Sequence, residues 1–299
     1  MPTRSRTVGL TEALIRAFVD NCRSGISARF LTAALLLVVS GGVAVVPGPA
    51  SAAAPAADDE AATAVFTSGR VPRLHIQLST AAADSLRGDP RAWVECTLAE
   101  DGGGSHERVA IRIKGSAGSG RGLDDRPALT VNMDRHVRGR RFHGLDKFHL
   151  NNAVQDDSLL RELLGSEIFR AAGIPAPRVT HARLRIDDHD LGLYVLKESY
   201  DEDFLRRSFP RADGNLYDGG AGQEIDEGLE RDEGKNGEAG ADLARIAAAC
   251  RIVDDDARWR TLDRRVARDA FLDFAALEAM TGHWDGYCNA RNNYRVYLD

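Results

Sequence analysis

The chain contains 299 residues, of which 43% are hydrophobic and 28% are charged, and its formal net charge is −6. This length allows one large domain or two lobes with a buried core, and the composition is typical of a soluble globular protein. An acidic surface repels phosphate backbones and anionic lipids. The composition therefore argues against a nucleic-acid partner and against a protein that binds membrane surfaces through charge.

An apolar run of 17 residues at positions 30–46 is the first clear feature of the chain. Arg23 and Arg29 precede it, and Ala50-Ser51-Ala52 follows it. This order of charged region, apolar region and small residues predicts a bacterial secretory signal peptide over residues 1–52. We therefore expect a secreted or cell-surface protein. An uncleaved membrane anchor is the alternative, although the run is short for a bilayer span.

Removal of the signal peptide changes the charge and the cysteine content. Residues 1–52 hold five arginines and two acidic residues, so the remainder has 34 basic and 43 acidic side chains and a net charge of −9. The cysteines that remain, Cys96, Cys250 and Cys288, are odd in number and lack the spacing of metal ligands. At most one disulfide bond is expected, and the pairing stays open.

The folded domain is predicted to begin at residue 65, because residues 53–64 are rich in Ala, Pro and Asp and are typical of a disordered linker. Beyond it, alternating apolar residues predict strands, and apolar residues at helical spacing predict helices. Strands are expected at 71–78, 93–98, 108–114, 128–133, 142–151, 180–187, 191–198 and 294–297. Helices are expected at 80–86, 158–172, 201–209, 241–253 and 256–282, the last of them broken near Arg264. The segment 211–240 shows no periodicity and is predicted to be an exposed, mobile loop.

A glycine-rich segment, residues 115–122, lies between the predicted strands 108–114 and 128–133. Its sequence begins Gly115-Ser116 and continues through Gly118. Glycines allow backbone N–H groups to approach phosphate oxygens closely, so these three residues are candidates for nucleotide binding. The pattern is not that of a Walker A loop. An ordinary flexible hairpin is the alternative.

Lysine is rare in this chain, and three of its four lysines, Lys114, Lys147 and Lys197, lie in predicted strands. Lys147 is the candidate for contacting the α- and β-phosphates of a bound nucleotide. Glu162, in the following helix, is the candidate carboxylate that pairs with Lys147, with Glu167 in reserve. A surface lysine and a glutamate that compensates the helix dipole are the alternatives.

The strand predicted at 191–198 ends at Glu198, where the chain enters a linker. In a nucleotide-binding framework of this order, the linker beginning at Glu198 would meet the adenine.

The loop after the last predicted helix carries the densest set of polar residues. Asp285 follows His283 and Trp284, and Asn289 and Asn293 follow within eight residues. Helix, polar loop with Asp and Asn, then strand is the order of a protein-kinase catalytic loop. Asp285 would orient or deprotonate the acceptor hydroxyl, and Asn289 and Asn293 would ligate Mg²⁺ or Mn²⁺ through amide oxygens. The alternative for Asp285 is the cap of an Asp-Gly turn.

The chain resembles the CotH kinase family, the group of secreted atypical protein kinases similar to spore coat protein H. The resemblance runs through nearly all of residues 65–299. It is carried by the motifs at 111–119, 142–152, 160–164, 172–178, 191–198, 204–205, 214–217 and 283–297.

This resemblance implies an α/β (α+β) protein with a divergent two-lobed protein-kinase-like fold. The small lobe would occupy about residues 65–200, and residues 201–299 would begin the large lobe. The resemblance also implies ATP with Mg²⁺ or Mn²⁺, and transfer of phosphate to Ser or Thr of secreted, surface or coat proteins. On the matching positions, Asp285 is the catalytic aspartate and Asn293 a metal ligand.

Two departures from the family pattern matter for this expectation. Arg126 stands where family members often have a lysine that binds phosphate. The family also continues past the last strand to a further aspartate, whereas this chain ends at Asp299, so we expect a truncated C-terminal lobe. The alternative function is a non-catalytic secreted protein, either a pseudokinase or coat component that binds nucleotide or a partner, or an inactive fragment.

Overall fold

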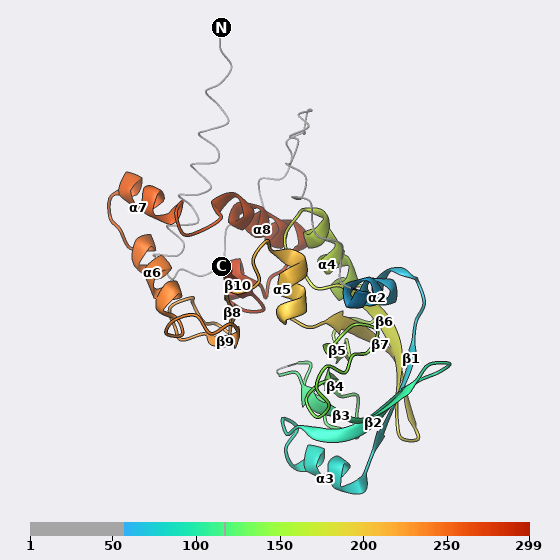
Figure 1. Ribbon diagram of the computed structural model, residues 1–299. Coiled ribbons are helices and arrows are strands. Elements are labelled where there is room, and N and C mark those ends of the chain that lie inside the picture. The colour runs from blue at the N-terminus through green and yellow to red at the C-terminus, as the bar shows by residue number, and fades with distance from the viewer. Residues whose placement is uncertain (1–56, 117) are drawn as a thin grey trace, which may run out of the picture. The chain divides into compact units, whose positions relative to one another are not determined.

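Seven strands form one sheet that closes into a barrel (Figure 1). The computed structural model describes residues 57–116 and 118–299, so the predicted signal peptide lies outside the described residues. Neighbouring strands are antiparallel, except that the first pairs with the sixth in parallel and so closes the barrel. In sequence order the strands are β1 (Arg73–Leu78), β2 (Val94–Glu100), β3 (Ser105–Lys114), β4 (Ala128–Asn132), β5 (Lys147–Asn151), β6 (Val179–Ile186) and β7 (His189–Glu198).

Alternation along each strand separates the barrel interior from its outer face. In β5, Phe148 and Leu150 are fully buried, whereas Lys147, His149 and Asn151 point to the other side and are half-buried. Burial of one such apolar side chain contributes about 1.5–3 kcal/mol, so the closed interior is a main source of stability. The outer face keeps the polar residues that concern the candidate site.

The prediction of a two-lobed kinase-like fold is wrong. The structure is an α+β protein built on a closed seven-stranded barrel, with helices and a separate three-stranded sheet. Closure depends on the pairing of Leu74 with Leu184 and of Ile76 with Ile186, contacts between strands about a hundred residues apart. Strand periodicity defines which residues point inward, but it carries no information about which edges meet.

Four helices belong to the barrel part of the chain: α2 (Ala57–Thr67), α3 (Thr80–Gly88), α4 (Arg161–Ala171) and α5 (Glu202–Ser208). Helix α2 begins in the stretch predicted to be a disordered linker and continues to Thr67, so ordered backbone begins before residue 65. Its first turn is acidic, which suits a helix N-terminus. The buried Arg178 donates hydrogen bonds to Asp59 (3.0 Å) and Thr63 (2.8 Å) of α2, which fastens this helix to the start of β6.

A second sheet has the order β10-β8-β9. Its strands are β8 (Asn215–Asp218), β9 (Glu230–Glu233) and β10 (Arg295–Leu298). Strands β8 and β9 lie inside the segment predicted to be an aperiodic loop, so that prediction is wrong for these eight residues. Each strand has only four residues, too few for alternation to stand out. The central strand β8 is ordered by pairing with β10, far along the chain.

The remaining helices are α6 (Ala241–Cys250), α7 (Asp255–Leu262), α8 (Arg268–Thr281) and α9 (Tyr287–Ala290). The predicted break near Arg264 is confirmed, since it lies between α7 and α8. Helix α8 ends at Gly282, which adopts a left-handed conformation (φ 66°) typical of a C-terminal cap. No helix within the described residues is both long and apolar enough to span a bilayer.

Candidate functional site

The outer face of the barrel carries a group of basic side chains around His149. Strand register places His149 opposite Thr130 on one side and opposite Lys197 on the other. Burial of His149, together with the positive charges of Lys114, Lys197 and Lys147, holds its pKa well below the usual value. His149 is therefore neutral at physiological pH. Three of the four lysines of the chain thus act electrostatically on one half-buried residue.

Lys197 forms the central ion pair of this group. Its Nζ lies 2.9 Å from Oε1 of Glu162 on α4, and Asn151 Nδ2 donates to both oxygens of the same carboxylate at 2.7 and 2.8 Å. Burial lowers the pKa of Lys197, but the Glu162 carboxylate reverses this and the net shift is upward. Burial raises the pKa of Glu162, and Lys197 and Asn151 outweigh it, so the net shift is downward. Both groups are therefore charged.

Lys114, the last residue of β3, forms no ion pair within the described residues, in contrast to Lys197. Burial lowers its pKa to about 8, with a further contribution from Lys197, while Glu162 opposes the shift. Glu162 therefore does not fully compensate for the burial of this ammonium. Lys114 also stands directly before the glycine-rich loop.

The predicted pairing of Lys147 with Glu162 is not present, because Glu162 pairs with Lys197 instead. Lys147 begins β5, four residues before Asn151, which corresponds to about 13 Å along a strand. At that end of the strand Lys147 lies among acidic groups. Burial raises the pKa of Asp146, Asp201 and Glu233, and the charge of Lys147 opposes each of these shifts.

Strand β10 joins the lysine group to the predicted catalytic loop. Arg295 forms a bidentate ion pair with Asp218 on β8 at 2.7 and 3.0 Å. Its guanidinium lies 4.4 Å from the ring centroid of Tyr200, and the Nζ of Lys197 lies 5.7 Å from the same ring. Tyr200 is therefore contacted by cations from β7 and from β10. The loop that contains Asp285 and Asn293 leads directly into β10.

The glycine-rich loop is a tight turn. Gly120 N donates to Ser116 O at 2.6 Å, and Asn152 Nδ2 donates to Ser119 O at 3.0 Å. Gly115 and Gly118 have φ values of 101° and 84°, which L-residues rarely adopt. A Cβ at Gly118 would also come within 2.3 Å of Gln155. The glycines are thus required by the turn itself, whether or not the loop binds phosphate.

Arg126 and Glu198 both have side chains engaged in the barrel. Arg126 donates to the carbonyls of Asn152 (3.0 Å), Leu191 (2.6 Å) and Leu193. These bonds engage all three nitrogens of its guanidinium with the barrel backbone. The carboxylate of Glu198 is 2% exposed and pairs with two arginines at 2.6 Å, one of them the buried Arg178. Contact of this segment with an adenine ring would therefore come from its backbone.

Asp285 is held by two of the asparagines that follow it. Its Oδ1 accepts from Asn292 Nδ2 at 3.0 Å, and its Oδ2 accepts from Asn293 Nδ2 at 2.7 Å. Asn289 Nδ2 donates to the carbonyl of Trp284 at 2.6 Å. Each predicted metal ligand, Asn289 and Asn293, thus uses its amide nitrogen within the loop and retains its amide oxygen, the atom that a hard cation prefers.

Glu278 is a residue of this site that the sequence prediction missed. It is 4% exposed in the last turn of α8. Its carboxylate accepts from the amides of Tyr287 (2.9 Å) and Cys288 (2.8 Å) at the start of α9. Burial raises its pKa, but the hydrogen bonds from His283 and these amides outweigh burial and lower it. The available signal was a glutamate in the mostly apolar second half of α8, directly before the polar loop.

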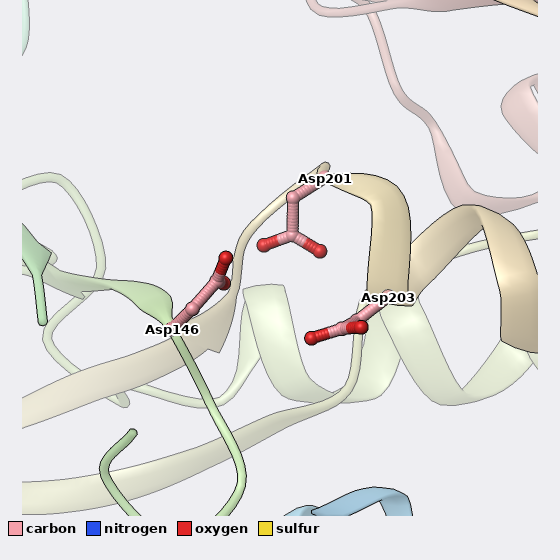
Figure 2. A group of neighbouring side chains, drawn as sticks. All are labelled: Asp146, Asp201 and Asp203. Carbon is pink, nitrogen blue, oxygen red and sulfur yellow. The ribbon is translucent and has the colours of Figure 1, made fainter. Parts of the chain in front are cut away.

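Three carboxylates, Asp146, Asp201 and Asp203, point toward one another at the start of β5 and α5 (Figure 2). One oxygen of each lies within 4.8 Å of the others. Arg141 and Arg206 already pair with Asp203. Burial, together with Asp146, raises the pKa of Asp201 to about 8, so this residue is protonated at neutral pH. The group therefore has little net charge left for a cation.

Comparison with known proteins places these features in a family. The family model described as CotH kinase protein matches residues 111–299. Spore coat protein homolog 1 of Rhizopus delemar is 29% identical over 164 residues, which cover 51% of this chain and 27% of the relative. From the same organism, invasin CotH7 is 28% identical over 164 residues (51% and 28%), and invasin CotH2 is 25% identical over 170 residues (51% and 29%).

The matched region spans less than a third of the length of these relatives. The family model, in contrast, covers well over half of this chain and includes Lys114, Glu162, Lys197 and Asp285. The chain therefore belongs to the CotH kinase protein family.

Proposed function

We propose that this protein is a surface or coat protein that transfers the γ-phosphoryl group of ATP to Ser or Thr hydroxyls of other surface or coat proteins. The observation that carries the proposal is the group of Lys114, Lys197 and Glu162 on the outer face of the barrel, next to the glycine-rich loop. The names of the relatives, spore coat protein homolog and invasin, support the location.

Lys114 and Lys197 are suited to hold the phosphates of a nucleotide. Lys197 is fixed by Glu162, so its position does not depend on the ligand. Lys114 is half-buried without a counterion, and a phosphate beside it would raise its lowered pKa and be stabilised in return. Neutral His149 adds no further repulsion between these cations.

Asp285 is suited to receive the proton of an acceptor hydroxyl. Hydrogen bonds from Asn292 and Asn293 to both carboxylate oxygens fix its orientation before a substrate arrives. The amide oxygens of Asn289 and Asn293 would hold Mg²⁺ or Mn²⁺. Bound ATP supplies the phosphoryl group, and its cation neutralises charge that develops on the phosphate oxygens.

The test uses the full chain with radiolabelled ATP and Mn²⁺. The Asp285→Asn and Lys197→Met variants should lose most of the transfer. Lys235, the fourth lysine, is exposed and outside the group, so Lys235→Met is the matched control and should transfer as wild type does. Thermal unfolding of each variant separates loss of chemistry from loss of fold. Equal transfer by wild type and Asp285→Asn would defeat the proposal.

A non-catalytic role is the second candidate, and it is favoured by relatives whose names describe a coat component and invasins. It predicts that ATP raises the melting temperature of the wild type but not of Lys197→Met, while no protein in the reaction becomes labelled. That combination of results would replace the transferase by a nucleotide-binding surface protein.

A further inference from the structure

Helix α4 exposes an apolar stripe along one side. Leu160, at the N-terminal cap of the helix, Leu164 and Ile168 are 44%, 51% and 44% exposed. Successive members are four residues apart, so their side chains follow one another along the same side of the helix. Seven large apolar side chains are exposed among the described residues, and three of the seven form this stripe. Apolar side chains gathered in this way, rather than scattered singly, mark an interaction surface.

The opposite side of α4 holds the helix to the rest of the molecule. Glu162 pairs with Lys197 on β7 at 2.9 Å. The ring of Phe169 lies 6.0 Å from that of Phe274 on α8. At about 100° per residue, Glu162 and Phe169 lie about 140–160° around the helix from Leu164. The apolar stripe is therefore the side of α4 that these contacts leave open to solvent.

The residues along this side are arranged symmetrically about Leu164. Leu160 lies four residues before it and Ile168 four residues after it. Arg161 lies three residues before it and Glu167 three residues after it. The side chains of Arg161 and Glu167 are 78% and 50% exposed. Each apolar residue thus has an apolar counterpart at the same distance from the centre, and the positive charge has a negative counterpart.

The two charged side chains have only exposed or long-range partners within the molecule. Arg161 Nε lies 3.6 Å from Asp156, and its Nη1 donates to the carbonyl of Gln155 at 3.2 Å. Glu167 pairs through Oε1 with Arg170, one turn further along the helix, at 2.6 Å. Surface pairs of this kind contribute little to stability. Arg161 and Glu167 can therefore pair with charges on a second molecule at small cost.

A two-fold axis at Leu164 makes this side of α4 complementary to itself. In an antiparallel helix pair related by such an axis, residues equidistant from the centre lie at the same level. Leu164 then meets its own copy, and Leu160 lies level with Ile168 of the second copy. Arg161 lies level with Glu167 of the second copy. A parallel pair would instead bring like charges together at each level.

We propose that α4 is the contact surface of a homodimer, in which the α4 helices of two copies pack antiparallel about a two-fold axis at Leu164. One helix face per copy is small beside the roughly 1,200–2,000 Å² that a stable interface buries in total. The net charge of −6 also makes the copies repel each other. The dimer is therefore weak and reversible, with a Kd on the order of 10–100 µM.

Sedimentation equilibrium of the full chain at about 5–500 µM, which brackets this Kd, measures the association. Arg161→Glu turns both charge pairs across the interface into repulsions between carboxylates, so the Kd should rise at least about tenfold. Glu167→Arg turns them into repulsions between guanidinium groups and should have the same effect. An equimolar mixture of the two variants should associate again, because a mixed pair has opposite charges at both ends of the contact.

Matched variants control for charge and for apolar area. Lys235→Glu reverses an exposed charge elsewhere and should leave the Kd within about twofold of wild type. Leu164→Ala shortens the central contact in both copies and should raise the Kd at least about tenfold. Met280→Ala, at a side chain 77% exposed on α8, should not change it. Thermal unfolding checks that each variant is folded.

Three results would each overturn the inference. The first is a chain that stays monomeric over the whole concentration range, which would leave the apolar stripe to a different protein. The second is association that neither charge reversal weakens, as expected if the apolar run at residues 30–46 were responsible. The third is a mixture of Arg161→Glu and Glu167→Arg that associates no better than either variant alone.

Discussion

At the scale of single residues, an ion pair on the outer face of the barrel affects the pKa of a neighbouring lysine. Lys197 and Glu162 stay charged because each lowers the cost of burying the other. Both charges act on the nearby Lys114. Burial and Lys197 lower the pKa of Lys114 by more than Glu162 raises it. The result is an ammonium that loses its proton more readily than other lysines do.

Lys114 should therefore react with amine reagents at pH 8 faster than Lys235 does. With a pKa of about 8, half of Lys114 is neutral at that pH, whereas an ordinary lysine with a pKa of about 10.4 is neutral in well under 1% of molecules. Labelling with a small acylating reagent, followed by mass spectrometry, measures the two rates. ATP should slow the reaction at Lys114 if phosphates bind there. Equal rates without ATP would contradict the lowered pKa.

Asp201 should make stability fall as pH rises. The folded protein keeps the Asp201 proton up to a pH of about 8, whereas the unfolded chain releases it near 3.8. Between these values the unfolded state binds fewer protons, so the free energy of unfolding decreases with pH. Asp201→Asn should reduce this slope by at most about 1.4 kcal/mol per pH unit. Urea unfolding at several pH values measures the slope.

Asparagine suits this test because Asp201 also caps α5 by accepting from Phe204 N, and asparagine caps helices equally well. Asp188→Asn, at an exposed turn, controls for the loss of one acidic side chain. An unchanged slope in Asp201→Asn would show that the pKa of Asp201 is not raised in the folded state.

At the scale of elements, the predicted catalytic loop takes its shape from the helix before it. Glu278 projects from α8 and binds the first amides of α9, so a four-residue helix gains a fixed N-terminus. Asn289, on α9, then fixes the carbonyl of Trp284. The orientation of Asp285 therefore depends on a buried carboxylate that need not touch a substrate.

Glu278→Ala should loosen this loop and lower stability by about 1.5–3 kcal/mol, the range for a hydrogen bond to a charged group. Hydrogen exchange at the amides of Tyr287 and Cys288 should become faster. Glu278→Gln keeps one acceptor oxygen and should free only one of the two amides. Glu238→Ala, at an exposed position, is the control. Protection that survives in Glu278→Ala would mean that α9 forms without this support.

At the scale of the whole molecule, the barrel and α2 are joined by one buried ionic network. Arg178 pairs with Glu198 at the end of β7 and with Asp59 of α2, and Arg207 of α5 joins through Glu198. Arg178 and Glu198 are 4% and 2% exposed. Loss of one partner would leave a charge buried without compensation, which is far costlier than loss of a surface pair.

Glu198→Ala should therefore lower the free energy of unfolding by about 3–5 kcal/mol. Glu167→Ala removes the exposed partner of Arg170 and should cost no more than about 1 kcal/mol. Urea unfolding compares the two variants. Similar losses in both would mean that the Arg178 network is not part of the cooperative core.

The family, the strand pattern and the polar loop around Asp285 followed from the sequence, because motifs and periodicity are local. Alternation separated Lys147 and His149 from the buried Phe148 whatever the strand paired with. Local sequence patterns could not show whether Lys147 or Lys197 pairs with Glu162. It depends on where α4 crosses β5 and β7, and α4 contacts Asn151 rather than the start of β5.

The sequence by itself determined the order of the seven barrel strands and of helices α3 to α8, and the residue types available for chemistry. Only the tertiary structure decided that the sheet closes through β1 and β6, that Lys197 holds Glu162, and that Glu278 supports the Asp285 loop. The physical reason is the same in each case. Local propensity fixes which face a side chain occupies, whereas the pairing of faces depends on burial and charge balance among residues distant in the chain.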